Sequence, residues 1–80
     1  MTRSPRLFAV FGFGSTHDAL DAEALLGDLG IEVVPIPAPK TVGTRCGIAL
    51  RLELSDEERA IAYVGAAGIP LLARVQIEDI

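Results

Sequence analysis

The residue best suited to chemistry in this chain is Cys46, the only cysteine among 80 residues. A cysteine thiolate is a nucleophile, and neighbouring positive charge favours the thiolate over the thiol. Arg45 precedes Cys46, Gly47 follows it, and Lys40 lies a short distance upstream. This stretch therefore predicts a reactive sulfur. The alternative is that Cys46 is a small core residue, as buried free cysteines commonly are.

The residues before Cys46 have the pattern of a strand, a helix and a second strand. Leu7–Phe13 is apolar on both parities, which is typical of a central strand covered on both faces. Ser15 or Thr16 can cap a helix that carries one apolar stripe and ends at the sequence Leu-Gly-Ile over 29–31. The short strand Glu32–Ile36 contains a proline, which cannot donate to a ladder and so favours an edge position.

The residues from Cys46 onward repeat this pattern. Apolar and polar residues alternate from Cys46 to Leu54, and Cys46 shares the parity of the apolar set. That parity turns its side chain toward a helix-covered face. Ser55–Glu58 has the spacing of a capping box for a second helix, which Gly68 and the following proline end. Leu71–Ile77 alternates again and predicts the last strand.

The order β-α-β-β-α-β, with right-handed crossovers, predicts an α+β ferredoxin-like sandwich over residues 1–80 as a single domain. We expect a four-stranded antiparallel sheet of order 4-1-3-2 with both helices on one face. The open face would show Ala49, Arg51, Leu72 and Arg74, a mixed surface that could close a homodimer.

This topology places the end of the first strand beside the start of the third. Residues 12–17 and 45–47 should therefore meet at one end of the sheet, where the N-terminus of the first helix supplies partial positive charge and free N–H donors. The predicted site consists of the Cys46 thiol and six binding residues: Ser15, Thr16, His17, Lys40, Arg45 and Gly47. In the simpler interpretation, Lys40 and Arg45 are solvated loop charges and His17 is an exposed first-turn residue.

Composition excludes several classes of function. The net charge is −4 and the basic residues are scattered, which argues against nucleic acids and anionic membranes as partners. No apolar run approaches the ~20 residues of a membrane span. One cysteine excludes an intramolecular disulfide and fits a reducing cytoplasm. One cysteine and one histidine cannot form a closed zinc site in one chain, and Gly12-x-Gly14 lacks the third glycine of a dinucleotide fingerprint. We therefore expect no metal and no cofactor.

Three segments of the chain resemble the selenium/sulfur (Se/S) carrier-like family. They are Phe-x-Ser-Thr-His-Asp-Ala-Leu over Phe13–Leu20, Leu-x-x-Leu-Gly-Ile over Leu26–Ile31, and Cys-Gly-Ile-Ala-Leu-Arg over Cys46–Arg51. The resemblance covers roughly Leu7 to Ile77. It implies a carrier that holds sulfur or selenium on Cys46 as a persulfide or perselenide, with access beside Gly47. The family has small hydroxyl residues before the cysteine, whereas this chain has Thr44-Arg45.

Three functions compete at this point. The first is a non-catalytic carrier that takes sulfur or selenium from a donor enzyme and passes it to an acceptor protein. The second is a small ligand-binding or regulatory module that acts as a homodimer. The third is a redox enzyme, which would need an external thiol because the chain has no resolving cysteine. Enzymatic activity is the least expected of the three.

Overall fold

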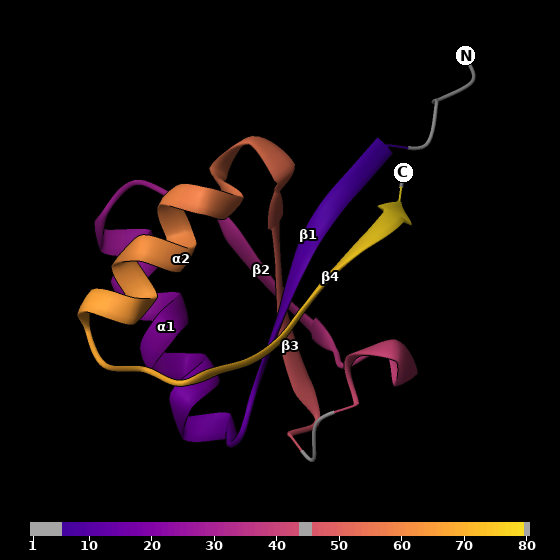
Figure 1. The fold of residues 1–80 in the computed structure, drawn as a ribbon, viewed down its shortest axis with the longest axis horizontal. Coiled ribbons are helices and arrows are strands. Elements are labelled where there is room, and N and C mark those ends of the chain that lie inside the picture. Colours follow the sequence, from indigo (N-terminus) through magenta and orange to yellow (C-terminus); the bar gives the residue numbers. More distant parts are fainter. Residues whose placement is uncertain (1–5, 44–45, 80) are drawn as a thin grey trace.

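The computed structural model describes residues 6–43 and 46–79 and has the predicted order of elements. The elements along the chain are β1 (Arg6–Phe13), α1 (Thr16–Asp28), β2 (Val33–Pro37), the short 3₁₀ helix η1 (Lys40–Val42), β3 (Ile48–Glu53), the 3₁₀ helix η2 (Leu54–Asp56), α2 (Glu57–Ala66) and β4 (Leu71–Asp79). Figure 1 shows how they are arranged.

The four strands form one antiparallel sheet in the order β2-β3-β1-β4. This is the predicted order 4-1-3-2 read from the other edge, so the expected α+β sandwich is confirmed. In the centre of the sheet, Phe11 of β1 lies between Leu50 of β3 and Arg74 of β4. The residues of β1 from Phe8 to Phe13 are buried, as expected for a central strand covered on both faces.

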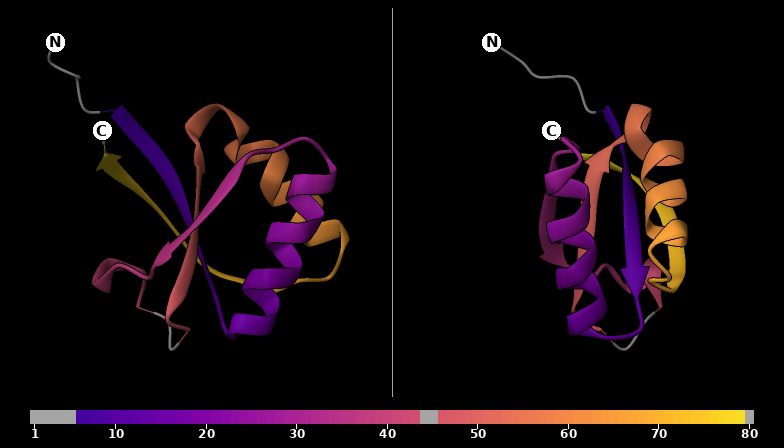
Figure 2. Two further views of the ribbon diagram at one scale, coloured as in Figure 1. Left: turned by 180° about the vertical axis from the view of Figure 1, so that it is seen from behind. Right: turned by 90° about the vertical axis from the view of Figure 1, so that its left-hand side faces the viewer.

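Both faces of the sheet are covered, but by different elements. The two helices pack on one face, around Phe11, Leu26 and Leu50. Val42 of η1 packs on the opposite face against Val10 and Ala49. In Figure 1 the helices lie to the left of the strands and η1 lies to the right, and Figure 2 shows both helices on the same side of the sheet. No helix in the described part of the chain is long and apolar enough to cross a membrane.

The two helices end in the same way, as their shared Gly-Ile sequence predicts. At the end of α1, the Ile31 N–H donates to the Leu26 carbonyl at 2.9 Å, and at the end of α2 the Ile69 N–H donates to the Val64 carbonyl at 3.1 Å. The glycine before each isoleucine has a positive φ, of 83° and 75° respectively. This is the Schellman motif, in which glycine reverses the chain and an apolar residue packs back onto the helix.

The start of α2 differs from the prediction. A serine cap at Ser55 was expected, but the structure has η2 over Leu54–Asp56 and α2 begins at Glu57 without a side-chain cap. The Asp56 carboxylate instead accepts a hydrogen bond from Arg59 at 2.9 Å. The extra 3₁₀ turn moves the helix start beyond the reach of the serine.

The open face of the sheet also differs from the expected mixed surface. Ala49 is fully buried beneath η1. Arg74 lies on the helix side, where its guanidinium is 3.6 Å from Glu57 and 3.4 Å from Glu58 of α2. The prediction was wrong for these two residues because η1 covers the open face and a register shift between β1 and β4 at Gly12/Phe13 changes the parity of β4.

Candidate functional site

Cys46 lies at the end of the sheet where α1 begins, two residues before β3. The strand begins at Ile48, so the prediction that Cys46 opens the strand was wrong by two residues. Its parity was predicted correctly, because the side chain belongs to the helix-side core with Phe13 and Leu50. Cys46 is 5% exposed.

Hydrogen bonds to the backbone hold the sulfur in place. The Cys46 S–H donates to the Ile48 carbonyl at 3.2 Å, and the Ile48 N–H approaches Sγ at 3.5 Å. This is the short-range arrangement in which a side chain bonds to the backbone two residues ahead and forms a local turn. The turn satisfies a buried sulfur and fixes its direction relative to β3.

Thr16, the first residue of α1, brings the second segment of the site to the sulfur. Its hydroxyl oxygen lies 3.9 Å from the Cys46 sulfur, across 30 positions of the sequence. The predicted meeting of the first helix with the segment before the third strand is therefore confirmed. The free N–H groups and partial positive charge of the helix N-terminus lie at the same end of the sheet as the sulfur.

The hydroxyl groups of Ser15 and Thr16 have different partners at the start of α1. The Ser15 hydroxyl accepts the Asp18 N–H at 3.1 Å, which makes Ser15 the N-cap. A cap hydroxyl of this kind satisfies one of the unpaired donors of the first turn. Because Ser15 fills this role, the Thr16 hydroxyl is available to the sulfur.

The other predicted site residues are placed as follows. His17 is in the first turn of α1, and its Nε2 lies 3.1 Å from Oδ2 of Asp21, with 84% of its side chain exposed. Its imidazole thus contacts the next turn of the helix. Lys40 is exposed at the start of η1. Arg45 lies outside the described residues. The roles proposed for these three side chains stay predictions.

Gly47, the residue that follows Cys46, is exposed. Apart from its chain neighbours Cys46 and Ile48, no described residue would lie within 4 Å of a Cβ placed on Gly47. Thr16, whose hydroxyl contacts the sulfur, is also exposed. Cys46 is therefore buried, while the next residue in the sequence and the residue whose hydroxyl contacts its sulfur are both exposed.

The comparison with protein families supplies the next observation. A family model described as "Putative Se/S carrier protein-like" matches residues 8–76, which extend from β1 into β4. The chain belongs to this family. Neither the curated proteins nor the solved structures gave a match. The segments that carried the resemblance, Phe13–Leu20 and Cys46–Arg51, are those that meet at the Thr16–Cys46 contact.

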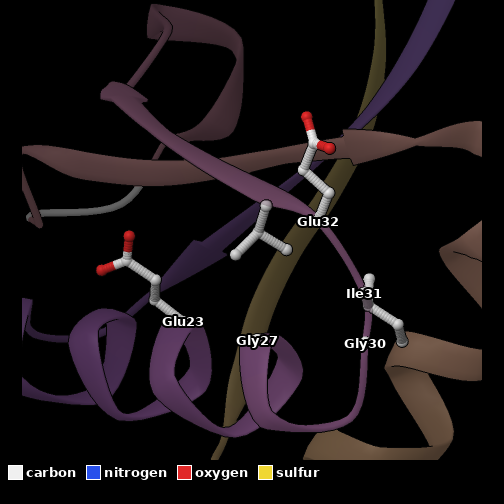
Figure 3. Close-up of a pocket in the computed structure, with 6 residues that line it drawn as sticks. Glu23, Gly27, Gly30, Ile31 and Glu32 are labelled. Atoms are coloured by element: carbon white, nitrogen blue, oxygen red, sulfur yellow. The ribbon is translucent and has the colours of Figure 1, made fainter.

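One recess in this Se/S carrier-like domain lies away from the cysteine. It is an open depression of about 400 Å³ between the C-terminal half of α1 and the start of β2. Figure 3 shows Glu23, Gly27, Gly30, Ile31 and Glu32 around it, with the two carboxylates not directed at one another. The recess contains neither a sulfur nor a histidine, and within the described residues no three metal-ligating side chains gather in one place. It is therefore separate from the Cys46 site.

Sequence reasoning did not find the backbone partner of the sulfur. The spacing of Cys46 and Ile48 allows a side chain-to-backbone turn, as it does for any serine, threonine or cysteine two residues before a strand residue. The single-residue signal is too general to select this conformation. The predicted alternation of the strand favoured an extended Cys46 instead.

Proposed function

We propose that this chain is a carrier that holds one sulfur or selenium atom on Cys46, as a persulfide or perselenide, between a donor enzyme and an acceptor protein. The observation that supports this most strongly is the position of the sulfur. The only cysteine of a Se/S carrier-like family member lies 3.9 Å from the hydroxyl at the start of α1. In this proposal the domain acts as a single unit over residues 1–80 and does not itself catalyse a reaction.

The loading step transfers one atom without any added oxidant or reductant. The Cys46 thiolate attacks the outer sulfur of a persulfide on the donor enzyme. The new S–S bond forms on Cys46 as the old one breaks, and the donor cysteine leaves as a thiolate. With selenium, the outer atom of the donor group is selenium, and it moves in the same way. Unloading repeats the step with a thiol of the acceptor as the nucleophile.

The site offers groups that suit an anion on the outer atom. The N-terminus of α1 carries partial positive charge and free N–H donors. The Thr16 hydroxyl can donate to the sulfur, and Ser15 keeps the helix start in place through its cap. His17, Lys40 and Arg45 are proposed to add positive charge when a donor or acceptor docks. Gly47 is proposed to leave room for the incoming sulfur, because it is exposed and has no side chain.

Loading requires the Cys46 side chain to move, because it is 5% exposed. The S–H bond to the Ile48 carbonyl must break, and Sγ must turn outward between Thr16 and Gly47. One neutral hydrogen bond contributes about 1 kcal/mol to stability. Rotation of one side chain is therefore a modest barrier, and a docked partner could offset it. We also propose a cytoplasmic location, because a lone reactive thiol persists in a reducing compartment.

The test is the mass of the intact protein after incubation with a cysteine desulfurase and either cysteine or selenocysteine. We expect the wild-type chain to gain the mass of one sulfur or one selenium atom, which a reducing agent then removes. The matched variant Cys46→Ser should gain nothing. An unmodified wild-type chain, or the same gain on Cys46→Ser, would contradict the proposal.

The second candidate is a ligand-binding or regulatory module in which Cys46 is a core residue. The observation that favours it is the burial of the sulfur with both of its Ile48 contacts formed. The two functions differ in the behaviour of the native thiol. If a small alkylating reagent modifies Cys46 only at the rate of global unfolding, the core role holds and the carrier role does not.

A further inference from the structure

The two edges of the sheet are built differently. The edge strand β2 has only five residues, and two of them are prolines, Pro35 and Pro37. Prolines and short length both protect an edge from pairing with another chain. The opposite edge strand β4 has nine residues from Leu71 to Asp79 and contains no proline. Its one register shift lies at its beginning, opposite Gly12/Phe13. The rest of β4 is a regular edge strand without proline.

The side chains of β4 separate into two rows. Ala73, Val75 and Ile77 are half-buried and pack with the apolar cluster on the face that carries η1. Arg74 lies on the helix side, because its guanidinium contacts the carboxylates of α2. Successive residues of a strand alternate between faces, so Gln76 and Glu78 share that side with Arg74. All three of these polar residues are exposed.

We propose that β4 pairs antiparallel with β4 of a second copy of this chain, about a twofold axis at Gln76. In that register Arg74 of each copy lies opposite Glu78 of the other, so two ion pairs form on the helix side. On the opposite face Val75 lies opposite Ile77, again twice. Opposite charges and apolar pairs directly across from each other both stabilise an antiparallel ladder.

Other registers match less well. Shifts by one residue place apolar residues of one copy on the polar face of the other, because the side-chain period is two. A twofold axis at Val75 pairs Arg74 with Gln76 and Leu72 with Glu78. In that register neither Arg74 nor Glu78 faces an opposite charge on the other copy. An axis at Arg74 places two like charges face to face, which destabilises a sheet. Among these registers, only the one with its axis at Gln76 pairs opposite charges on one face and apolar residues on the other.

The strand β4 lies at the outer edge of the sheet. In both views of the front and back, the end of β4 extends beside the start of β1, away from the two helices (Figures 1 and 2). Pairing about a twofold axis there would give a continuous eight-stranded sheet with the helices of both copies on one side. The Cys46 site lies at the opposite end of β1, beside the start of β4. The proposed interface therefore does not depend on the proposed carrier function, and each can be tested without the other.

Sedimentation and cross-linking test the interface directly. We expect the wild-type chain to pass from monomer to dimer between about 1 μM and 1 mM. In a Cys46→Ser background, Gln76→Cys places two thiols across the axis, about 5 Å apart at Cβ, so a short bis-maleimide should link the dimer. Leu72→Cys is the matched control, since its two copies would be roughly 27 Å apart and should not link. A wild-type chain that is monomeric throughout this range would overturn the proposal.

A charge exchange tests the register itself. Glu78→Arg places arginines opposite each other, and Arg74→Glu places carboxylates opposite each other, so each variant alone should dimerise about tenfold more weakly. Mixed in equal amounts, the two variants restore both ion pairs, and the heterodimer should recover wild-type affinity. Glu32→Arg makes the same charge change away from β4 and should have no effect. Circular dichroism verifies that Arg74→Glu is folded despite its lost contacts with α2. A mixture that associates no better than its components, or a Glu78→Arg chain as dimeric as the wild type, would overturn the register.

Discussion

At the scale of single residues, the hydroxyl groups at the start of α1 have separate tasks. Ser15 caps the helix through the Asp18 N–H, and Thr16 contacts the Cys46 sulfur. The Ser-Thr pair therefore both begins the helix and connects it to the cysteine. One residue supplies the cap, and the other extends the helix start to a sulfur that is 30 positions away in the sequence. We regard Thr16 as a positioning residue for the proposed transfer.

Replacing Thr16 with valine tests this assignment. Thr16→Val keeps the branched shape but removes the hydroxyl, so we expect the rate of sulfur loading on Cys46 to fall by about threefold to tenfold. That change corresponds to a hydrogen bond of about 1 kcal/mol. Because Thr16 is exposed and the cap stays on Ser15, the free energy of unfolding should change by less than about 0.5 kcal/mol.

Thr16→Ser is the matched control, since it retains the hydroxyl. It should load at nearly the wild-type rate in the same mass-spectrometric time course. If Thr16→Val loads as fast as Thr16→Ser, the hydroxyl has no role in the transfer. If Thr16→Ser is as slow as Thr16→Val, retaining the hydroxyl does not preserve the rate, and the hydrogen-bond account is wrong.

Part of this site follows from sequence and part does not. The meeting of the Ser15–His17 segment with Cys46 follows from strand order, because antiparallel neighbours bring distant residues to the same end of a sheet. The depth of the sulfur and its bonds to Ile48 depend on one side-chain torsion and on where β3 begins. Strand ends shift by one or two residues with little change in pattern, so the sequence could not supply these details.

At the scale of elements, the two Schellman ends organise each half of the chain. Each helix of this Se/S carrier-like domain ends at a glycine of positive φ, and the following isoleucine returns to the helix through a backbone hydrogen bond. These ends were predictable because only glycine adopts that conformation at little cost. The start of α2 was not, because Ser55–Glu58 fits a capping box as well as it fits the 3₁₀ turn that the structure has.

A pair of glycine substitutions in α1 measures the importance of this end. Gly30→Ala places a side chain at φ 83° and should lower the free energy of unfolding by about 1–2 kcal/mol. Gly27→Ala lies within the same helix, where a new Cβ would meet no atom within 4 Å, and should raise it by up to about 1 kcal/mol. Urea unfolding of both variants gives the comparison. Equal effects, or a stabilising Gly30→Ala, would contradict the assigned helix end.

At the scale of the whole molecule, the sheet has a core on each side. The larger one lies under the helices and includes Cys46, and the smaller one lies under η1 and centres on Val10, Val42 and Ala49. The strand order and the helical face could be predicted from apolar periodicity. The second core could not, since Val42 is one apolar residue in a polar stretch that has no period. Its burial depends on the path of the chain between β2 and β3.

Replacing Val42 tests whether η1 is bound to the sheet as the structure shows. Val42 is 6% exposed, so Val42→Ala should lower the free energy of unfolding by about 2 kcal/mol through lost burial and a residual cavity. Thr41→Ala, at the exposed neighbour, should change it by less than about 0.5 kcal/mol. Urea unfolding measures both. An equal response of the two variants would show that η1 does not pack on the sheet.

The central claim is that Cys46 carries an atom, and a carrier must release what it receives. The most direct measurement starts from the loaded protein, purified away from its donor, and follows its intact mass after an excess of a small thiol is added. The account predicts that every molecule loses one sulfur or selenium atom and returns to the unmodified mass, with the atom recovered on the added thiol. A loaded Cys46 that keeps its atom, or an atom that proves to be attached elsewhere in the chain, would contradict it.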